Sequence, residues 1–222
     1  MSKLFKICDL GLRFTFFIFG ELKIEGFENI PKNKSIITVS NHLSIIDPPL
    51  CASAVGKDTK FLAKKELFKF PFNIFLKFYG AFPINRGKLD MSAINWAKNQ
   101  LNSKNNSLLI FPEGTRSKNL KLQKGFNGAA MIAMDTDSVI LPISISGSEK
   151  CRNYLQFIFP TMSVCIKIGK PFKIKSLSEN RNKKLYENIT NEIMNRISIL
   201  LPKSYLNEPS DIIKKYKYTK VI

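Results

Sequence analysis

Histidine is nearly absent from this sequence: its 222 residues include one, His42. A Cys/His zinc site needs several ligands of these types close together, and the cysteines at positions 8, 51, 151 and 165 form no C-x-x-C pair. We therefore expect no bound metal. We interpret the four cysteines as reduced, mostly buried side chains of a cytoplasmic protein.

Acidic residues are also scarce, with 17 Asp and Glu against 35 Lys and Arg, a formal net charge of +18. Such an excess attracts anions, which include nucleic acid, acidic lipid head groups and phosphorylated substrates. A basic nucleic-acid-binding protein is a distant alternative, because no helix-turn-helix signature, zinc finger or basic heptad segment is present. The G-x-S-x-G elbow is absent too, which argues against the common serine hydrolase fold.

The most apolar stretch, residues 1–20, is too often interrupted by charge to resemble a spanning helix, which needs about 20 nearly uncharged residues. Helical spacing would gather Lys6, Asp9 and Arg13 on one face and place Phe5, Leu12, Phe16 and Phe19 largely opposite. This pattern predicts an amphipathic helix in a membrane interface. An ordinary helix packed on the domain is the alternative, and a signal peptide is disfavoured because no small-x-small cleavage site follows.

The rest of the chain alternates between strand-like and helix-like segments, and its length and 44% hydrophobic content suit one domain with a substantial core. The alternation predicts an α/β fold with a mixed, largely parallel sheet flanked by helices. We divide the chain into an interface helix (1–20), a domain (21–205) and a loosely attached basic tail (206–222). The predicted strands are 35–40, 60–63, 107–111, 139–145 and 163–168. We predict a short helix that begins at residue 47, and three longer helices at 89–101, 125–134 and 185–197.

The first polar motif, N-H-x-x-x-x-D, follows the strand-like run that ends at Ser40. Ligands of open α/β sheets gather at the carboxyl ends of strands. A histidine acts as a general base when an acceptor holds its far ring nitrogen, and Asp47 could be that acceptor for His42. A structural histidine beside an aspartate that caps the helix before Pro48 fits the same spacing, so the spacing alone leaves both interpretations open.

Two more motifs stand in loops after strand-like runs: G-A-F-P-I-N-R-G from Gly80 and F-P-E-G-T-R-S from Phe111. In the latter, Gly114 allows the backbone to approach a ligand and Arg116 offers a planar fork of donors for phosphate. Glu113 could orient the arginine or accept a hydrogen bond from a substrate hydroxyl. A surface turn with a local salt bridge is the alternative.

Together these motifs resemble those of the glycerophospholipid acyltransferases, in particular the 1-acylglycerol-3-phosphate (lysophosphatidate) acyltransferases. Four blocks of that family occur here in order, within residues 35–147. They are N-H-x-x-x-x-D at 41–47, a glycine, apolar run and arginine at 80–86, F-P-E-G-T-R-S at 111–117, and an apolar strand with a proline at 139–143. Asn85 departs from the pattern, since many relatives have an acid there, but the arginine that follows is kept.

The resemblance implies a glycerol-3-phosphate acyltransferase-like fold and a reaction. An acyl chain would pass from acyl-CoA or acyl carrier protein to the free hydroxyl of lysophosphatidate, which gives phosphatidic acid. Glycerol 3-phosphate or another lysophospholipid is the alternative acceptor. The thioester donor is already activated, so no cofactor is implied. The implied residues are His42 as base, Asp47 as its partner, and Arg86, Glu113, Gly114, Thr115 and Arg116 at the acceptor, with the arginines at its phosphate.

The expected location is the cytoplasmic face of the cell membrane, where the protein would bind peripherally or monotopically. The positive charge would hold it to an anionic membrane surface, and the N-terminal helix would insert into the interface.

Overall fold

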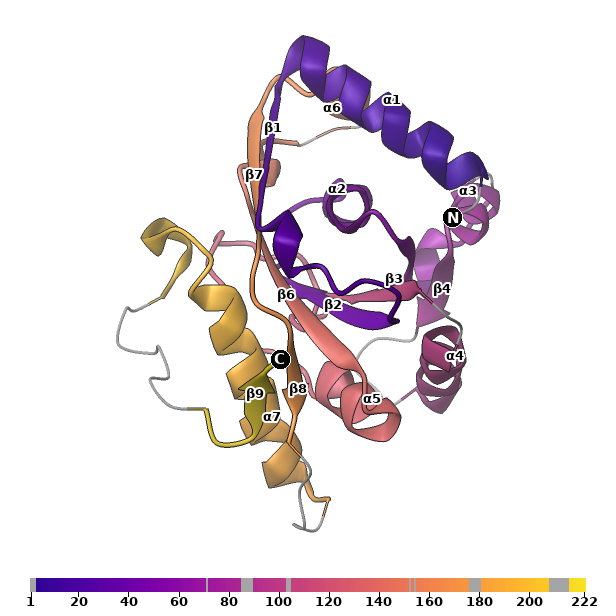
Figure 1. The fold of residues 1–222 in the computed structure, drawn as a ribbon. Helices are drawn as coiled ribbons and strands as arrows, with labels where there is room; N and C mark the ends of the chain where they lie inside the picture. The colour runs from indigo at the N-terminus through magenta and orange to yellow at the C-terminus, as the bar shows by residue number, and fades with distance from the viewer. Residues whose placement is uncertain are drawn as a thin grey trace.

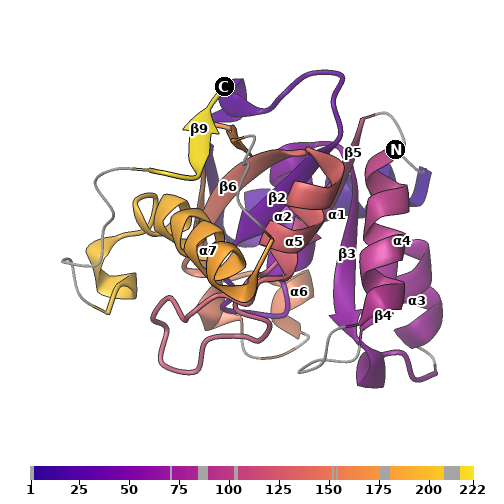
Figure 2. The same ribbon diagram turned by 90° about the horizontal axis from the view of Figure 1, so that it is seen from below.

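The computed structural model describes residues 3–70, 72–84, 90–102, 105–151, 153, 155–175, 181–207 and 216–222. A twisted sheet lies at the centre with helices on both faces (Figures 1 and 2). Along the sheet the strand order is β1-β7-β6-β2-β5-β3-β4, and β8 pairs with β6 and β9. Most pairs are parallel, while β6–β7, β6–β8 and β8–β9 are antiparallel. The predicted single α/β domain with a mixed, largely parallel sheet is confirmed.

The described strands are β1 (Glu21–Glu25), β2 (Ile36–Ser40), β3 (Asp58–Lys64), β4 (Ala81–Ile84), β5 (Asn106–Ile110), β6 (Val139–Ser146), β7 (Ser163–Ile168), β8 (Phe172–Ile174) and β9 (Thr219–Val221). The α-helices are α1 (Lys3–Phe19), α2 (Asp47–Val55), α3 (Phe72–Phe78), α4 (Met91–Asn102), α5 (Gly128–Thr136), α6 (Leu155–Ile158) and α7 (Lys183–Ser198). Short 3-10 turns lie at Phe27–Asn29, Lys65–Leu67, Ser148–Lys150 and Lys203–Tyr205.

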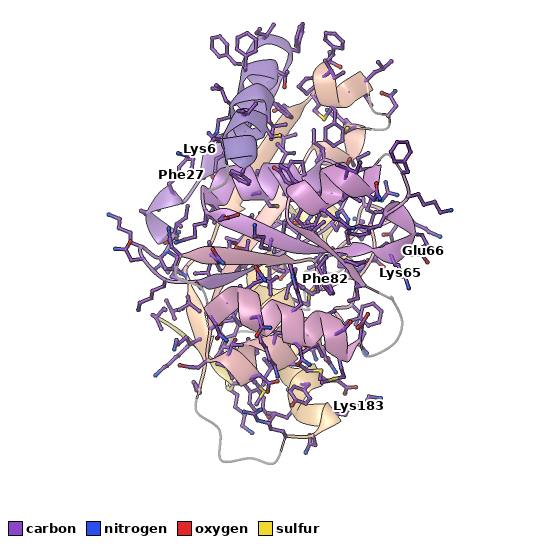
Figure 3. All side chains as sticks on the ribbon, turned by 90° about the vertical axis from the view of Figure 1, so that its right-hand side faces the viewer. Lys6, Phe27, Lys65, Glu66, Phe82 and Lys183 are labelled. Carbon is purple, nitrogen blue, oxygen red and sulfur yellow. The ribbon has the colours of Figure 1, made fainter. Side chains whose placement is uncertain are left out.

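The central strands β6, β2, β5, β3 and β4 all point the same way, so their carboxyl ends meet at one edge of the sheet. Figure 3 shows Lys65 and Glu66, just after β3, at that edge. Phe27, just after β1, lies at the other edge because β1 pairs in parallel with β7, which is antiparallel to β6. Residues that follow the central strands are therefore brought together although they are far apart in sequence.

Two hydrophobic cores lie on the two faces of the sheet, as the alternation of strand side chains requires. In β5, Leu109 packs into the core that includes α1 and α2, while its neighbour Leu108 packs into the core that includes α4, α5 and α7. β2 shows the same division at Ile36 and Ile37. Strands buried on both faces are continuously apolar, which is why these two were predictable from the sequence.

Helix α1 packs on the domain through one apolar face and exposes a second one. Phe5 and Phe16 are buried in the core, and Phe16 is only 1% exposed. Arg13 pairs with Asp9 and also donates to the backbone carbonyl of Ser53 in α2. The face expected to enter a membrane is thus largely covered by protein. A different row points outward, made of Ile7, Leu10, Phe14, Phe17 and Ile18.

The end of the chain also differs from the loosely attached tail that we expected. Residues 219–221 form strand β9, which pairs with β8. The buried carboxylate of Glu192 accepts hydrogen bonds from the backbone N–H groups of Lys217 (2.7 Å) and Tyr218 (2.9 Å) and from the Thr219 hydroxyl (2.7 Å). Arg196 of the same helix lies over the rings of Phe172 and Tyr216. The final residues are therefore an integral part of the fold.

Part of the second polar motif is a strand rather than a loop. Ala81–Ile84 forms β4 and pairs in parallel with β3, with Phe61 opposite Ala81. Phe82 stacks on Trp96 of α4, with ring centroids 4.7 Å apart. No helix among the described residues is both long enough and apolar enough to cross a membrane.

Candidate active site

The chain leaves β2 directly into the first polar motif, and Asn41 fixes its direction. The side-chain amide of Asn41 donates to the Ile145 carbonyl (2.9 Å) and accepts from the Ile145 N–H (2.8 Å). This side chain thus extends the ladder between β2 and β6 by one further pair of hydrogen bonds. His42 follows at the carboxyl edge of the sheet with its side chain mostly buried.

His42 and Asp47 form the predicted pair. The distance from His42 Nδ1 to Asp47 Oδ2 is 2.8 Å, and the same oxygen accepts from the N–H groups of Leu43 (2.6 Å) and Ser44 (2.7 Å). A carboxylate oxygen that takes three hydrogen bonds requires the proton on Nδ1, so Nε2 is left as the basic ring nitrogen. The imidazole also stacks on Phe111, with ring centroids 4.1 Å apart.

Asp47 does not cap helix α2, which was one of the two roles that the sequence left open. The cap residue is Ile46. In the first turn, which begins at Asp47, the two prolines Pro48 and Pro49 have no N–H group that would need a cap. The Asp47 side chain instead turns back onto residues 42–44. Among the described residues nothing donates to its other oxygen, Oδ1, although that atom is buried. The carboxylate therefore serves the histidine turn and not the helix end.

Glu113 is buried beside His42 and spans two backbone groups. Its Oε1 accepts from the His42 N–H (2.8 Å), and its Oε2 accepts from the Gln123 N–H (2.9 Å). Burial raises the pKa of Glu113 to about 7; the two backbone hydrogen bonds act in the opposite direction, and the nearby Asp47 charge adds to the rise. Both carboxylate oxygens therefore accept hydrogen bonds from backbone N–H groups of the protein. Glu113 contacts His42 through the histidine backbone and not through its ring.

Two residues of the third motif lie on the surface. Thr115 and Arg116 are exposed. Gly114 has φ +67°, and a Cβ added there would lie 3.0 Å from the Phe126 ring. The positive φ favours glycine at this position, and a larger residue would also require the Phe126 ring to shift. Arg86, the predicted arginine of the second motif, lies outside the described residues.

Sequence reasoning missed two groups near His42. The Ser117 N–H donates to the His42 carbonyl (2.8 Å), and the Gln123 N–H completes the bridge through Glu113. A backbone donor carries no side-chain signature, so no signal in the sequence marks either contact. In the part of the chain that the structure describes, no three His, Cys, Asp or Glu side chains are grouped to hold a metal ion.

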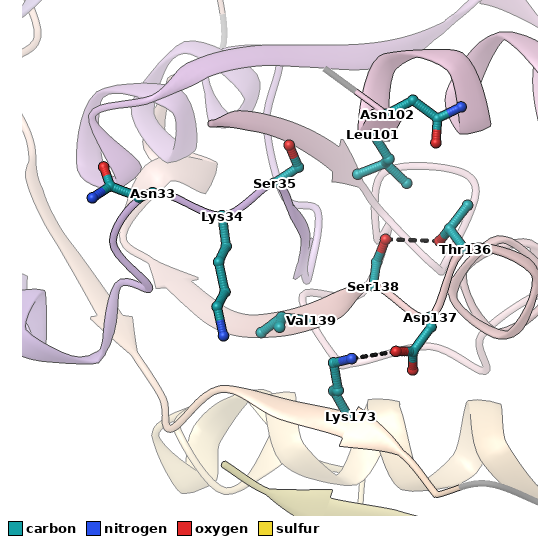
Figure 4. A pocket seen from close by; sticks show the side chains of 10 residues that line it. All are labelled: Asn33, Lys34, Ser35, Leu101, Asn102, Thr136, Asp137, Ser138, Val139 and Lys173. Carbon is teal, nitrogen blue, oxygen red and sulfur yellow. Dashed lines mark hydrogen bonds and ion pairs between the residues drawn. The ribbon is translucent and has the colours of Figure 1, made fainter. Parts of the chain in front are cut away.

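A hollow of about 330 Å³ lies at the opposite edge of the sheet, beside the amino ends of β2 and β6 (Figure 4). Lys34 and Ser138 line it, and Lys173 forms an ion pair with Asp137 at its rim. Ligands of such sheets bind at the carboxyl ends of the strands, and His42 lies there. We therefore place the candidate active site at His42 and not at this hollow.

The fold is a mixed α/β sheet with a buried histidine–aspartate pair at its carboxyl edge. Such a pair is an arrangement suited to general-base chemistry, and it defines the class of protein. The sequence model of the acyltransferase family matches residues 21–146, which is more than half of the chain. The chain therefore belongs to the acyltransferase family, and the resemblance seen in the four blocks is confirmed.

Individual relatives agree with this assignment. The chloroplastic 1-acyl-sn-glycerol-3-phosphate acyltransferase LPAT1 of Arabidopsis thaliana is 33% identical over 149 residues, 65% of this chain and 41% of that protein. The enzyme of the same name from Borreliella burgdorferi is 28% identical over 182 residues, 80% of this chain and 72% of that protein. The crystal structure of the 1-acyl-sn-glycerophosphate acyltransferase PlsC from Thermotoga maritima superposes with a TM-score of 0.66 at 27% identity, covering 90% of this chain and 81% of that one.

Proposed function

We propose that this protein transfers an acyl chain from a thioester donor to the free hydroxyl of 1-acylglycerol 3-phosphate, which yields phosphatidic acid for phospholipid synthesis. The observation that carries the proposal is the 2.8 Å contact between His42 and Asp47 at the carboxyl edge of the sheet. The relatives named above support the choice of acceptor, since their names give 1-acyl-sn-glycerol 3-phosphate as the molecule they acylate.

In the proposed reaction, His42 Nε2 takes the proton of the acceptor hydroxyl as its oxygen attacks the thioester carbonyl. Asp47 holds the ring through Nδ1 and stabilises the imidazolium that forms. The tetrahedral intermediate then collapses. The new C–O ester bond remains, the C–S bond breaks, and the proton on Nε2 passes to the departing sulfur to give the free thiol.

Arg116 is the described residue best suited to the acceptor phosphate, because it is exposed on the loop that contacts the His42 backbone. Its planar fork can form two parallel hydrogen bonds to phosphate oxygens. We propose the same role for Arg86 from its place in the second motif. Phosphate binding would hold the hydroxyl near Nε2, and positioning of this kind lowers a barrier by several kcal/mol.

The donor can be acyl-CoA or an acyl carrier protein, because both present the acyl chain as a thioester and both carry negative charge. A net charge of +18 favours either partner through long-range attraction. The reaction assay below therefore includes both donors.

We further propose that α1 binds an anionic membrane surface at the cytoplasmic face as a peripheral or monotopic anchor. The outward row of α1 leaves Phe17 86% exposed and Leu10 70% exposed. Phe19 at the end of α1 contacts Phe159, and exposed Leu155 and Ile158 of α6 lie close by in the chain. An apolar helix face of this extent, next to basic residues worth about 1 kcal/mol each at an anionic surface, fits an interfacial helix.

The test of the reaction offers lysophosphatidate and glycerol 3-phosphate to the purified protein, each with acyl-CoA and with acyl carrier protein. We expect acylation of lysophosphatidate, and we expect His42→Ala to lower its rate about 10²–10⁴-fold, the usual contribution of a general base. Circular dichroism checks that the variant is folded. A rate for His42→Ala within about threefold of the wild type would exclude His42 as the base.

The anchor is tested by Leu10→Glu, with Ile199→Glu as the matched control. Both side chains are exposed aliphatic groups, but Ile199 follows α7 on the other side of the sheet (Figure 1). Point substitution is preferable to deletion of residues 1–20, because Phe5 and Phe16 belong to the core. We expect Leu10→Glu alone to weaken co-sedimentation with anionic vesicles. Equal binding by the two variants would contradict the anchor.

A further inference from the structure

The loop from Glu113 to Gln123, called the 113–123 loop below, holds the peptide groups of His42 on both sides. The His42 N–H donates to Glu113 Oε1 and the His42 carbonyl accepts from the Ser117 N–H, each at 2.8 Å. The same loop carries Arg116 directly before Ser117. Any shift of this loop therefore changes the proposed base and the proposed phosphate ligand together.

The Gln123 side chain closes this loop from within. Its Nε2 donates to Asn119 Oδ1 and to the Lys121 carbonyl, both at 2.7 Å. The Ser117 hydroxyl is directed at the same two acceptors, at 3.0 and 2.7 Å. Gln123 Nε2 also lies 3.5 Å from Ser117 Oγ, so the two side chains are joined both directly and through shared partners, and Ser117 is the residue next to Arg116. The turn between them includes Leu120 with φ +63°, a conformation that a leucine adopts only when its surroundings hold it.

The outer side of the loop is attached to the chain after α7. The Leu122 N–H donates to the Tyr205 carbonyl (2.8 Å), and the Lys121 ammonium donates to the Ser204 carbonyl (2.8 Å). These contacts fix residues 121 and 122. Within 114–119 the Ser117 N–H is held by the His42 carbonyl, and the rest of the path is set by the internal contacts. The Gln123 side chain supplies two of those contacts.

We propose that Gln123 is a positioning residue for acyl transfer, because its side-chain donors close the 113–123 loop and thereby fix Arg116 relative to His42. The proposal rests on the proposed function, in which Arg116 binds the acceptor phosphate. Gln123 itself contacts no reacting atom. Its effect should accordingly be seen in acceptor binding and not in donor binding.

Two substitutions remove the side-chain donors in different ways. Gln123→Glu keeps the shape and turns an oxygen toward two acceptors, while Gln123→Met removes the polar group and adds no charge. The backbone N–H to Glu113 is present in both. Gln100→Glu is the matched control, since Gln100 lies near the end of α4, which leads to the amino end of β5 at the opposite edge.

The first measurement is trypsin cleavage after Arg116, Lys118 and Lys121, at a temperature well below the melting transition of every variant. Loss of two hydrogen bonds should open the loop more often, and we expect cleavage within it about fivefold faster for both Gln123 variants than for wild type and Gln100→Glu. Unchanged cleavage would overturn the proposal, because the side chain would then not hold the loop.

The second measurement separates a positioning role from a general loss of folding. We expect the KM for lysophosphatidate to rise about fivefold in both variants while the KM for the acyl donor stays within about twofold. Faster cleavage with an unchanged acceptor KM, or equal changes for donor and acceptor, would overturn the positioning role. If wild type failed to acylate lysophosphatidate, the proposed function and this role would fall together, and the cleavage result would still decide whether Gln123 closes the loop.

Discussion

Two buried glutamates in this molecule accept hydrogen bonds from distant backbone, and they do so differently. Glu192 takes both of its backbone N–H donors on one oxygen, Oε1, and the other oxygen faces the hydroxyl of Thr219. Glu113 takes its two donors on separate oxygens, with His42 on one and Gln123 on the other. Of the two glutamates, only Glu113 therefore needs both oxygens to hold two separate segments in place, one at His42 and one at Gln123.

The surroundings of the two carboxylates differ as well. Glu192 lies near the guanidinium of Arg196, which also contacts Thr219. Glu113 has the Asp47 carboxylate as its charged neighbour, and burial raises its pKa to about 7. Glu192 and the cation Arg196 both contact Thr219 of strand β9. Glu113, in contrast, is buried next to a second acidic side chain, Asp47. Strain of this electrostatic kind is typical of functional sites.

Among changes to these two glutamates, the largest effect is expected for Glu113→Gln. A glutamine offers one acceptor oxygen, so its NH₂ group must face either the His42 N–H or the Gln123 N–H, and that buried donor is left unpaired. Such a group costs about 1–3 kcal/mol, and relief requires that the loop move away from His42. We expect the rate of acyl transfer to fall about tenfold or more. Steady-state assays check this, and activity within about twofold of wild type would show that the double bridge is dispensable.

The residues of the polar motifs could be found from the sequence, but the contacts that each side chain makes could be predicted only in part. The continuous apolar runs of β2, β5 and β6 made the core strands visible, and because these strands are parallel, the first and third polar motifs, which follow β2 and β5, begin at the same edge of the sheet. Short strands such as β8 and β9, which are partly polar, give no such signal. The path of the Asp47 side chain was likewise hidden, because Asp before Pro suits a helix cap equally well.

The pH dependence of stability gives the next largest effect. The pKa of Glu113 is about 7 in the folded protein and 4.5 in the unfolded chain, so between these values the folded state holds a proton that the unfolded state has released. The free energy of unfolding should therefore fall as pH rises from about 4.5 to 7, by at most about 3 kcal/mol. Urea denaturation across this range measures the slope.

Glu113→Gln is the control for this slope, since glutamine does not titrate. We expect its unfolding free energy to vary less over the same pH range than that of wild type. Parallel curves for wild type and Glu113→Gln would mean that Glu113 titrates at an ordinary pH.

The smallest effect is expected for Glu192→Gln, although its side chain receives more hydrogen bonds than Glu113 does. The amide oxygen can accept from both Lys217 and Tyr218, as Oε1 does now. What is lost is the hydrogen bond from the Thr219 hydroxyl and the charge beside Arg196, which keeps its ring contacts with Phe172 and Tyr216. We expect a loss of about 1 kcal/mol in unfolding free energy and acyl transfer within about twofold of wild type. If thermal denaturation and assays instead show Glu192→Gln to be as inactive as Glu113→Gln, the arrangement of donors on the two oxygens does not explain the difference between the two sites.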